Sequence, residues 1–427
     1  MFFKEFPTPK EPVIPSLTVD IRDFGAVEGE LSNAISRAIE HTAEHGGGRV
    51  NVPCGEWLTG QIHLKSNIEL HFEKGARVTF APSPELYLPV VLTMYEGMRC
   101  YNYSPLIYAN GVENVAVTGD VILDGNGAEW WKWAKNMTAR DILYSGTLPL
   151  EKRIFGTPEY GLRPMFLQIL NGKNILLDGI TLCNSPCWTL NLVWCKDAIV
   201  RNVKIHNPTD SPNTDGINIE SSNRVIVEDC TVVTTGDDMY CLKAGRNEDA
   251  WDVGIPCENV IIRRCKSLGP SRSGGIAIGS EMSAGVRNIL AEDCEFEYNV
   301  NCVRIKSKDG RGGYVENIDF RNLYMKKGLR GINISYRYSC EARDDAEEPG
   351  KYMPVVRNIS LENITCDSVR NGITLENLPN GVMENLHFKN ITMTAEKCLA
   401  TDSVKGLYLE NINITEEKGA GANLYEE

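Results

Sequence analysis

The sequence predicts an all-β fold, a single-stranded parallel β-helix wound from many copies of one short phrase. Two observations support this prediction: the phrase recurs along most of the chain, and a second short apolar strand follows many of its copies. No helical segment separates the copies, so alternating β–α–β units are excluded. Coils of short strands instead bury their apolar side chains against the coils above and below.

The repeated phrase begins with asparagine or another polar residue and continues with alternating apolar positions. Its first clear copy starts at Asn174 and reads Asn-Ile-Leu-Leu-Asp-Gly-Ile-Thr-Leu. Such alternation encodes strands with one buried face. The recurrent asparagine is expected at the bends, where its side chain can bond to the turn. Further copies start at residues 197, 224, 259, 288, 317, 358, 385 and 406.

The strands between the phrases have the pattern of Gly-Ile-Asn-Ile at 216–219. The spacing between phrases varies, which indicates a constant unit with loops of different length inserted in it. A β-propeller is the main alternative, but its blades need ~40–45 residues and a regular aromatic signature. Similar strands are found at 275–278, 302–305, 331–334 and 372–375.

A solenoid needs capped ends, and residues 31–45 predict a short helix that caps the N-terminal end. Three glycines follow this segment and are expected to stop the helix. Its apolar residues fall on one helical face: Ala34, Ile35, Ala38 and Ile39.

The whole chain is expected to form one domain, with an extension at 1–17, the β-helix at 18–415 and a tail at 416–427. Two segments lack the phrase and are predicted to be long loops: the tryptophan-containing 129–163 and the acidic 340–354. Loops of this length are usually functional or disordered.

Composition and charge limit the classes of function. The 427 residues are 42% hydrophobic and 24% charged, so the chain can bury a large core and is not disordered as a whole. No apolar stretch approaches the ~18 residues of a membrane span. The formal net charge of −13 argues against nucleic acid as a partner, because phosphate binding usually needs a basic surface. No signal-peptide pattern is visible, which predicts a cytoplasmic protein, or a secreted one whose signal has been removed.

The fourteen cysteines are interpreted as free thiols, because their spacing is irregular in a long chain. Buried thiols favour a reducing compartment. Cys183 and Cys187 lack a second pair of ligands at zinc-like spacing, so neither a metal site nor a cofactor is expected. Several of the fourteen occupy apolar positions of the repeat: Cys230, Cys265, Cys294 and Cys366.

One strand row carries unusual outward-facing polar residues. Equivalent positions in neighbouring coils lie about 4.8 Å apart, so residues distant in sequence form one patch. Clustered carboxylates suit glycoside hydrolysis, in which one acid protonates the leaving oxygen while other carboxylates activate water. Taken alone, each motif has a plainer interpretation as a turn or a solvated face. The row contains Asp215, Asp237, Asp238, Lys243 and Glu281, followed by Arg304 and Lys306, which are both expected to point to solvent.

Four motifs, in this order, resemble those of glycoside hydrolase family 28, the polygalacturonase family. They are Asn-Thr-Asp-Gly at 213–216, Gly-Asp-Asp at 236–238, Gly-Ser-Glu at 279–281 and Arg-Ile-Lys at 304–306. The resemblance extends over about residues 18–415. Motifs at 23–26, 46–48, 58–60 and 124–127 resemble the bacterial branch of the family.

The resemblance implies a right-handed β-helix of the pectin-lyase-like type and an inverting, metal-independent hydrolase that cleaves α-linked galacturonic acid residues in pectin. It implies that Asp237 is the general acid and that Asp215 and Asp238 hold and activate the water. It also implies a group of substrate-binding residues: Arg304 and Lys306 on a galacturonate carboxylate, Tyr336 or Tyr338 on a sugar, and Lys243 and Glu281 along the cleft.

One departure from the family concerns a histidine. Members usually carry a Gly-His-Gly segment shortly before Gly-Ser-Glu, whereas residues 271–280 here contain no histidine. His206 is near a motif but is interpreted as an ordinary turn residue. We expect Arg272 or Ser273 to fill the space, and an active enzyme with altered specificity or rate.

The sequence favours removal of galacturonate from the ends of short pectic oligosaccharides, since long loops can close the cleft and the acidic shell repels long pectate. A monomer or weak homo-oligomer is expected. The nearest alternative is a rhamnogalacturonan-type or other pectic glycosidase. A pectate-lyase-like enzyme would need Ca²⁺, and a non-catalytic carbohydrate-binding solenoid would bind without cleaving.

Overall fold

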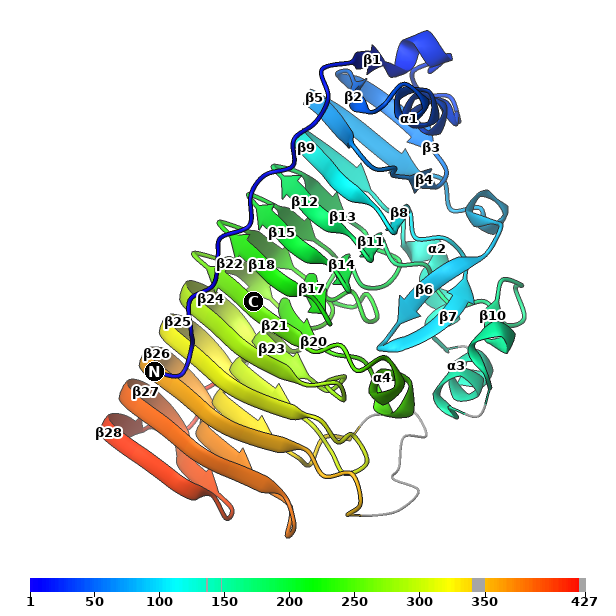
Figure 1. The fold of residues 1–427 in the computed structure, drawn as a ribbon. Helices are drawn as coiled ribbons and strands as arrows, with labels where there is room; N and C mark the ends of the chain where they lie inside the picture. Colours follow the sequence, from blue (N-terminus) through cyan, green and yellow to red (C-terminus); the bar gives the residue numbers. More distant parts are fainter. Residues whose placement is uncertain (136, 147, 340–349, 422–427) are drawn as a thin grey trace.

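The computed structural model is an elongated parallel β-helix whose coils follow one another in sequence order from the N-terminal to the C-terminal end (Figure 1). It describes residues 1–135, 137–146, 148–339 and 350–421. Twenty-five strands form one sheet, and strands of successive coils pair in parallel. The predicted all-β solenoid is therefore confirmed.

The strands fall into three groups along the solenoid. The first coils contain β1 (Thr18–Asp20), β2 (Gly48–Val52), β3 (Gly55–Thr59), β4 (Ile62–His63), β5 (Ile68–Phe80), β8 (Ile107–Asn110) and β9 (Glu113–Asp124). The middle coils contain β11 (Leu167–Leu170), β12 (Lys173–Asp178), β13 (Thr181–Cys183), β14 (Leu190–Val193), β15 (Lys196–Arg201), β16 (Lys204–His206), β17 (Ile217–Glu220), β18 (Asn223–Glu228), β19 (Thr231–Thr234), β20 (Tyr240–Lys243), β21 (Cys257–Arg263), β22 (Lys266–Pro270) and β23 (Gly274–Gly279). The last coils are the long strands β24 (Val286–Lys306), β25 (Tyr314–Ser335), β26 (Val355–Glu376), β27 (Val382–Thr401) and β28 (Lys405–Glu416).

The remaining elements lie at one end or on one side of the solenoid. A small separate sheet contains the antiparallel pair β6 (Val91–Tyr95) and β7 (Met98–Asn102), with β10 (Ile154–Phe155) beside β7. The helices are α1 (Ala34–Glu44), α2 (Ala128–Trp131), α3 (Met137–Tyr144) and α4 (Asn247–Val253), with 3-10 turns η1 (Ile21–Phe24), η2 (Pro84–Tyr87), η3 (Lys132–Lys135) and η4 (Leu150–Lys152).

The residue that starts each repeated phrase lies at a bend in the left-handed conformation, with φ of 54° at Asn174 and 56° at Asn259. Asparagine tolerates this conformation better than most residues. Its amide also bonds to the asparagine of the preceding coil: Asn288 Nδ2 donates to Asn259 Oδ1 over 2.6 Å. The expected position of the asparagines at the bends is confirmed.

The interior is filled by apolar rows that run from coil to coil. Ile276, Val303 and Ile332 occupy paired positions in β23, β24 and β25, and all are fully buried. The predicted buried cysteines belong to this interior, and the thiols within the described ranges are free. Within the same ranges, no helix has the length and apolar character needed to cross a membrane.

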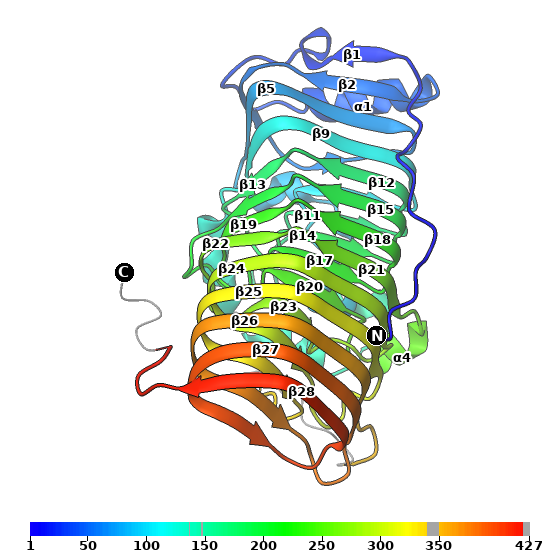
Figure 2. The same cartoon turned by 90° about the vertical axis from the view of Figure 1, so that its left-hand side faces the viewer.

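Helix α1 covers the first coil, as predicted, and buries Ala34, Ile35, Ala38 and Ile39. Residues 1–17, which were expected only as an extension, run along the outside of the coils to the level of β26 (Figures 1 and 2). There, Phe2 N donates to Asp319 Oδ1 over 2.8 Å. Lys4 exchanges two hydrogen bonds with Asn288. We call this segment the N-terminal strap.

The small β6–β7–β10 sheet and α3 form a wall beside the middle coils (Figure 1). Buried apolar side chains hold the wall together: Tyr95, Cys100, Leu143, Phe155 and Trp188. The segment 129–163 was predicted to be a long loop, but it contains α2, α3 and short turns because its tryptophans and leucines pack against this side of the solenoid. Most of the acidic segment, 340–349, lies outside the described residues, as does the end of the tail at 422–427.

Candidate active site

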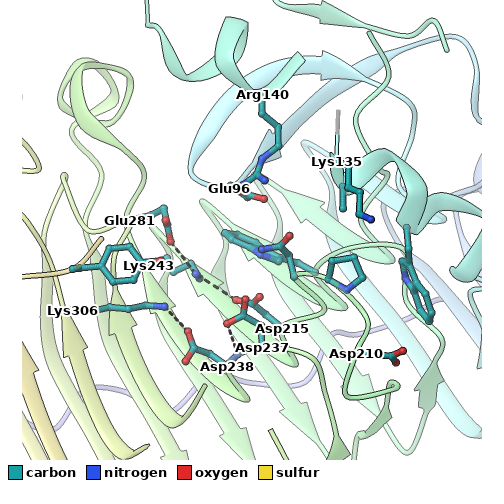
Figure 3. Close-up of a pocket in the computed structure, with 16 residues that line it drawn as sticks. Glu96, Lys135, Arg140, Asp210, Asp215, Asp237, Asp238, Lys243, Glu281 and Lys306 are labelled. Atoms are coloured by element: carbon teal, nitrogen blue, oxygen red, sulfur yellow. Dashed lines mark hydrogen bonds and ion pairs between the residues drawn. The ribbon is translucent and has the colours of Figure 1, made fainter. Parts of the chain in front are cut away.

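Three aspartates from two adjoining coils line one pocket of about 590 Å³ (Figure 3). Asp215 lies directly before β17, and Asp237 and Asp238 lie before β20, which pairs with β17 in register. Asp215 and Asp238 are buried, while Asp237 keeps part of its surface exposed. Four other predicted residues line the same pocket: Lys243, Glu281, Lys306 and Tyr338.

Close backbone approach between the two coils explains the glycine of the Gly-Asp-Asp motif. A Cβ atom on Gly236 would collide with the carbonyl oxygen of Ser211. The backbone N–H of Gly216 donates to the carbonyl oxygen of Asp238 over 2.9 Å, which fixes the two aspartate-bearing turns side by side. The two aspartate motifs therefore are turns, as their plainer interpretation expected, and these turns also position the carboxylates.

Asp238 is held as an anion. Lys306 Nζ lies 2.7 Å from its Oδ2, and the backbone N–H of Gly274 donates to its Oδ1 over 2.6 Å. Arg304 lies 4.0 Å away. Burial alone would favour the neutral acid, but Lys306 and Arg304 outweigh it and lower the pKa of Asp238 well below its usual range.

Lys243 lies beneath the pocket between two carboxylates. Its Nζ is 2.9 Å from Glu281 Oε2, 3.4 Å from Asp215 Oδ2 and 4.2 Å from the centre of the Trp188 ring. Burial opposes ionisation of Glu281, but Lys243 holds the pKa of that carboxyl well below normal. For Asp215, burial together with repulsion from Asp237 and Asp238 raises the pKa, and Lys243 opposes this rise.

Asp237 has the environment of a proton donor. Burial and the neighbouring charge of Asp238 raise its pKa. Its Oδ1 accepts the N–H of Asp238 over 2.9 Å, and no ion pair to it is found among the described residues. Burial raises the pKa of Asp215 more strongly than that of Asp237. The Lys243 ammonium, however, lies 3.4 Å from Asp215 and favours its ionised form, whereas Asp237 contacts no cation among the described residues, so we assign the shared proton to Asp237.

The outward pair Arg304 and Lys306 is more enclosed than expected. Their side chains are 20% and 8% exposed, because they turn toward Asp238 and lie near the Tyr338 ring, 5.6 and 5.2 Å from its centre. Arg304 does not line the main pocket but a smaller one of about 150 Å³ that adjoins it. The prediction that both point freely into solvent is wrong for this reason.

Of the two candidate tyrosines, only Tyr338 reaches the pockets. Tyr336 is 1% exposed, and its hydroxyl donates to the carbonyl oxygen of Val382 over 2.6 Å. The proposed role of Tyr336 in substrate binding is therefore incorrect. Tyr336 continues the alternation of β25, in which every second side chain, including Ile332 and Ile334, points inward.

Ser273 lies next to Asp238 in the segment that lacks the family's histidine. Its hydroxyl donates to Asp238 Oδ1 and accepts from Arg304 Nη1, the latter over 2.7 Å. Arg272, the other candidate for this space, is exposed. Ser273 thus links Arg304 to the carboxylate. His206 is exposed at the end of β16.

The wall contributes residues that were not predicted. Glu96, at the turn between β6 and β7, accepts from Arg140 Nη2 over 3.1 Å and from the hydroxyl of Tyr144. Figure 3 shows Glu96 and Arg140 together at the edge of the pocket opposite Asp238. The only sequence signal was the length of the non-repeating segments. Asn213, from the Asn-Thr-Asp-Gly motif, also lines the pocket, and the other unpredicted lining residues are Trp131, Ala134, Lys135, Trp188, Asp210 and Pro212.

One cluster among the described residues has ligand atoms close enough for a metal ion: Asp215, Asp238 and Cys241, within 4.8 Å of one another. Lys306 and Lys243 already contact the two carboxylates and supply positive charge there. A cation would have to compete with these ammonium groups, so the cluster is better suited to holding a neutral water.

Comparisons with known proteins agree with this geometry. The family model "Glycosyl hydrolases family 28" matches residues 151–418. The chain belongs to this family. A "Probable polygalacturonase" from Vitis vinifera is 31% identical over 87% of this chain and 73% of its own length. A hyperthermoactive exopolygalacturonase from Thermotoga maritima is 35% identical, with a TM-score of 0.84 over 96% of this chain and 94% of its own.

The family 28 assignment confirms the resemblance found in the motifs and identifies the chain as a glycoside hydrolase. The "Exopolygalacturonase" of Zea mays is 25% identical over 82% of this chain and 77% of its own length. The family 28 exopolygalacturonase of Yersinia enterocolitica, at 22% identity and a TM-score of 0.78 over 95% of this chain and 76% of its own, shows the fold alone. Membership of the family supports a role in pectin hydrolysis.

Proposed function

We propose that this family 28 hydrolase removes galacturonate from the ends of short pectic oligosaccharides with inversion at the anomeric carbon. The observation that carries the proposal is a cluster of three aspartates in a pocket that a wall bounds on one side. The β6–β7 turn and α3 are the parts of the wall nearest the pocket, with Glu96 and Arg140 at the pocket edge. On the side of β24 and β25, the pocket continues past Lys306.

Asp237 acts as the general acid and gives its proton to the glycosidic oxygen as the bond to the anomeric carbon breaks. Asp215 and Asp238 hold the attacking water and take up its proton. Their carboxylate oxygens lie within 4.8 Å of each other, which supports one water bound to both. Attack by this water on the face opposite the leaving group inverts the anomeric carbon.

The wall supports exo action, because it bounds the pocket where a longer chain would continue. Glu96 presents a carboxylate at this edge of the pocket. Together with its partner Arg140, it closes this edge and offers hydrogen-bond partners to the hydroxyls of a terminal sugar. A terminal sugar therefore fits better than an internal one.

Lys306 and Arg304 support a uronate as the substrate, because both cations lie where the pocket continues away from the wall. An arginine fork and a lysine suit a carboxylate. The net charge of −13 over the whole chain disfavours long polyanions, so short oligosaccharides suit the molecule better. The free thiols of the core fit a reducing compartment, and we propose such a location.

Time-resolved product sizing on defined oligogalacturonates tests this function. We expect galacturonate monomer from the earliest time points, new reducing ends in equal number, and no effect of a chelator. Early mid-chain fragments would contradict exo action. An ultraviolet-absorbing product that a chelator abolishes would establish a lyase instead, and binding without new reducing ends would establish a non-catalytic solenoid. Faster cleavage of rhamnogalacturonan oligomers would favour the alternative glycosidase.

A further inference from the structure

A cationic pocket adjoins the aspartate pocket. It has a volume of about 150 Å³, and Lys306 and Tyr338 line both pockets, so the two lie side by side. We call it the arginine pocket. Four cations, Arg304, Lys306, Arg330 and Arg337, line it together with the carboxylate of Glu376. This concentration of positive charge contrasts with the net charge of −13 of the chain.

Arg330 has one carboxylate near it, that of Glu376, which opposes the fall of its pKa only in part. Among the described parts of the chain, no hydrogen bond or ion pair to its guanidinium is found. Burial and the positive charge of Arg304 both lower the pKa of Arg330. Two guanidinium groups kept together in a partly buried pocket repel each other, and a bound anion would remove that cost.

The other charged groups of the pocket are already engaged. Glu376 accepts a hydrogen bond from Ser335 Oγ over 2.6 Å. Arg337 pairs with Asp402 over 2.7 Å at an exposed position. These contacts leave Arg330 and Arg304 as the pair facing an unfilled space, and one Arg304 nitrogen, Nε, is buried without a hydrogen-bond partner.

The arginine pocket lies on the C-terminal side of the aspartates, away from the wall. Arg304 belongs to β24, whereas Arg330 belongs to the next coil, in β25. Successive coils advance by about 4.8 Å, and the sugar rings of a linear glycan advance by a comparable step. Asn333 of β25 is in register with Arg304, and Arg330 lies three residues before Asn333, on the rim of the same pocket. A ligand whose terminal sugar lies at the aspartates thus places its next ring at Arg304 and the ring after that over β25, where the long Arg330 side chain lines the pocket.

We propose that the arginine pocket binds the carboxylate of a second galacturonate on the leaving-group side, one sugar beyond the galacturonate held by Arg304 and Lys306. This inference rests on the proposed function and extends it to substrate length and composition. Guanidinium groups bind carboxylates through paired, charge-assisted hydrogen bonds. The pocket therefore favours chains with a free carboxylate on every ring over chains in which neutral or methyl-esterified sugars alternate.

The test compares trigalacturonate with digalacturonate, because only the trimer has a sugar for this pocket. The test variant is Arg330→Gln, which removes the positive charge. A second variant, Arg330→Lys, keeps the charge but loses the planar guanidinium group that can bind both oxygens of a carboxylate. The matched control is Arg357→Gln on β26, whose side chain pairs with Glu316 at an exposed position. The ratio of trimer to dimer kcat/KM should fall by about ten- to a hundredfold in Arg330→Gln, as for a lost hydrogen bond to a charged group, and less in Arg330→Lys. The control should keep the wild-type ratio.

A binding measurement gives a second readout. In the Asp237→Asn background, calorimetry should show tighter binding of trigalacturonate than of digalacturonate, and Arg330→Gln should abolish the difference. A trimer methyl-esterified on its reducing-end carboxylate should bind like the dimer. An unchanged trimer-to-dimer ratio in Arg330→Gln, with unchanged trimer affinity, would overturn the pocket assignment. Wild type that binds both ligands but hydrolyses neither would overturn the proposed function and leave the pocket assignment in place.

Discussion

Lys306 Nζ and Asp238 Oδ2 lie 2.7 Å apart across 68 residues of sequence, in side chains that are 8% and 1% exposed. A buried pair of this kind is costly to break, because the remaining charge loses its partner. Lys306 therefore keeps Asp238 ionised beneath the proposed water. Because the lysine also faces the substrate side of the pocket, one residue links substrate binding to the charge state of the base.

Lys306→Met should shift the acidic limb of the pH–rate profile to higher pH. Lys306 lowers the pKa of Asp238, so this carboxyl stays ionised as pH falls through the usual aspartate range. Without the lysine, Asp238 binds its proton at higher pH, by about one to three pH units. The profile of kcat/KM against pH measures the shift. Lys266→Met, which removes an exposed pair with Glu295, is the control; an unmoved limb in Lys306→Met would contradict the assignment.

Ser273→Ala should lower kcat/KM about tenfold or more, in line with the loss of hydrogen bonds to charged groups. The Ser273 hydroxyl connects Arg304 to Asp238, and its loss frees the arginine to move. Ser273→Thr retains the hydroxyl and should restore most of the activity. Equal activity of the alanine variant and wild type would show that Ser273 is not the link that takes the place of the family's histidine.

The free energy of unfolding should fall as pH rises through the range in which Glu220 titrates. Burial raises its pKa to about 7 from 4.5, and one of its oxygens is buried without a partner. Between these values, the unfolded chain releases the proton while the folded chain keeps it, so stability falls through this window and levels off above it. Glu220→Gln should thus be more stable than wild type by up to ~3 kcal/mol at pH 8, with a smaller difference near pH 5. Urea unfolding at both pH values measures this; a pH-independent difference would contradict it.

Removal of residues 2–12 should lower the free energy of unfolding without changing KM. The N-terminal strap satisfies Asp319, which is 0% exposed, and Asn288, and both lie on the outer face of the coils. Loss of three such hydrogen bonds costs about 2–4 kcal/mol. Thermal unfolding and kinetics of the truncated chain provide the two readouts. A changed KM would show that the strap reaches the active site.

Much of the fold follows from local pattern. Asparagine at most phrase starts predicted the bends because few other residues accept a left-handed φ, as Asn174 and Asn259 do. Period-two alternation predicted the buried rows. The aspartates could be placed together because parallel coils in register bring equivalent positions into contact, as β17 and β20 do.

The wall could not be predicted in this way. Glu96 and Arg140 meet through packing between two non-repeating segments, and no periodic pattern fixes such long-range contacts. The enclosure of Lys306 depends on Tyr338, which lies beyond the end of β25. Tyr338 has the same parity as the buried Tyr336 but turns toward the pocket, so alternation fails between these two residues. Alternation could have placed Tyr336, since its parity with Ile334 points it into the core.

In the proposed mechanism, Asp237 protonates the leaving oxygen while water held by Asp215 and Asp238 attacks from the other face. Proton NMR of the first product released from trigalacturonate tests it most directly. We expect the β-anomer of galacturonate to appear first and to mutarotate afterwards, and Asp237→Asn, which still binds the trimer, to release almost none. First appearance of the α-anomer, or full activity of Asp237→Asn, would contradict it.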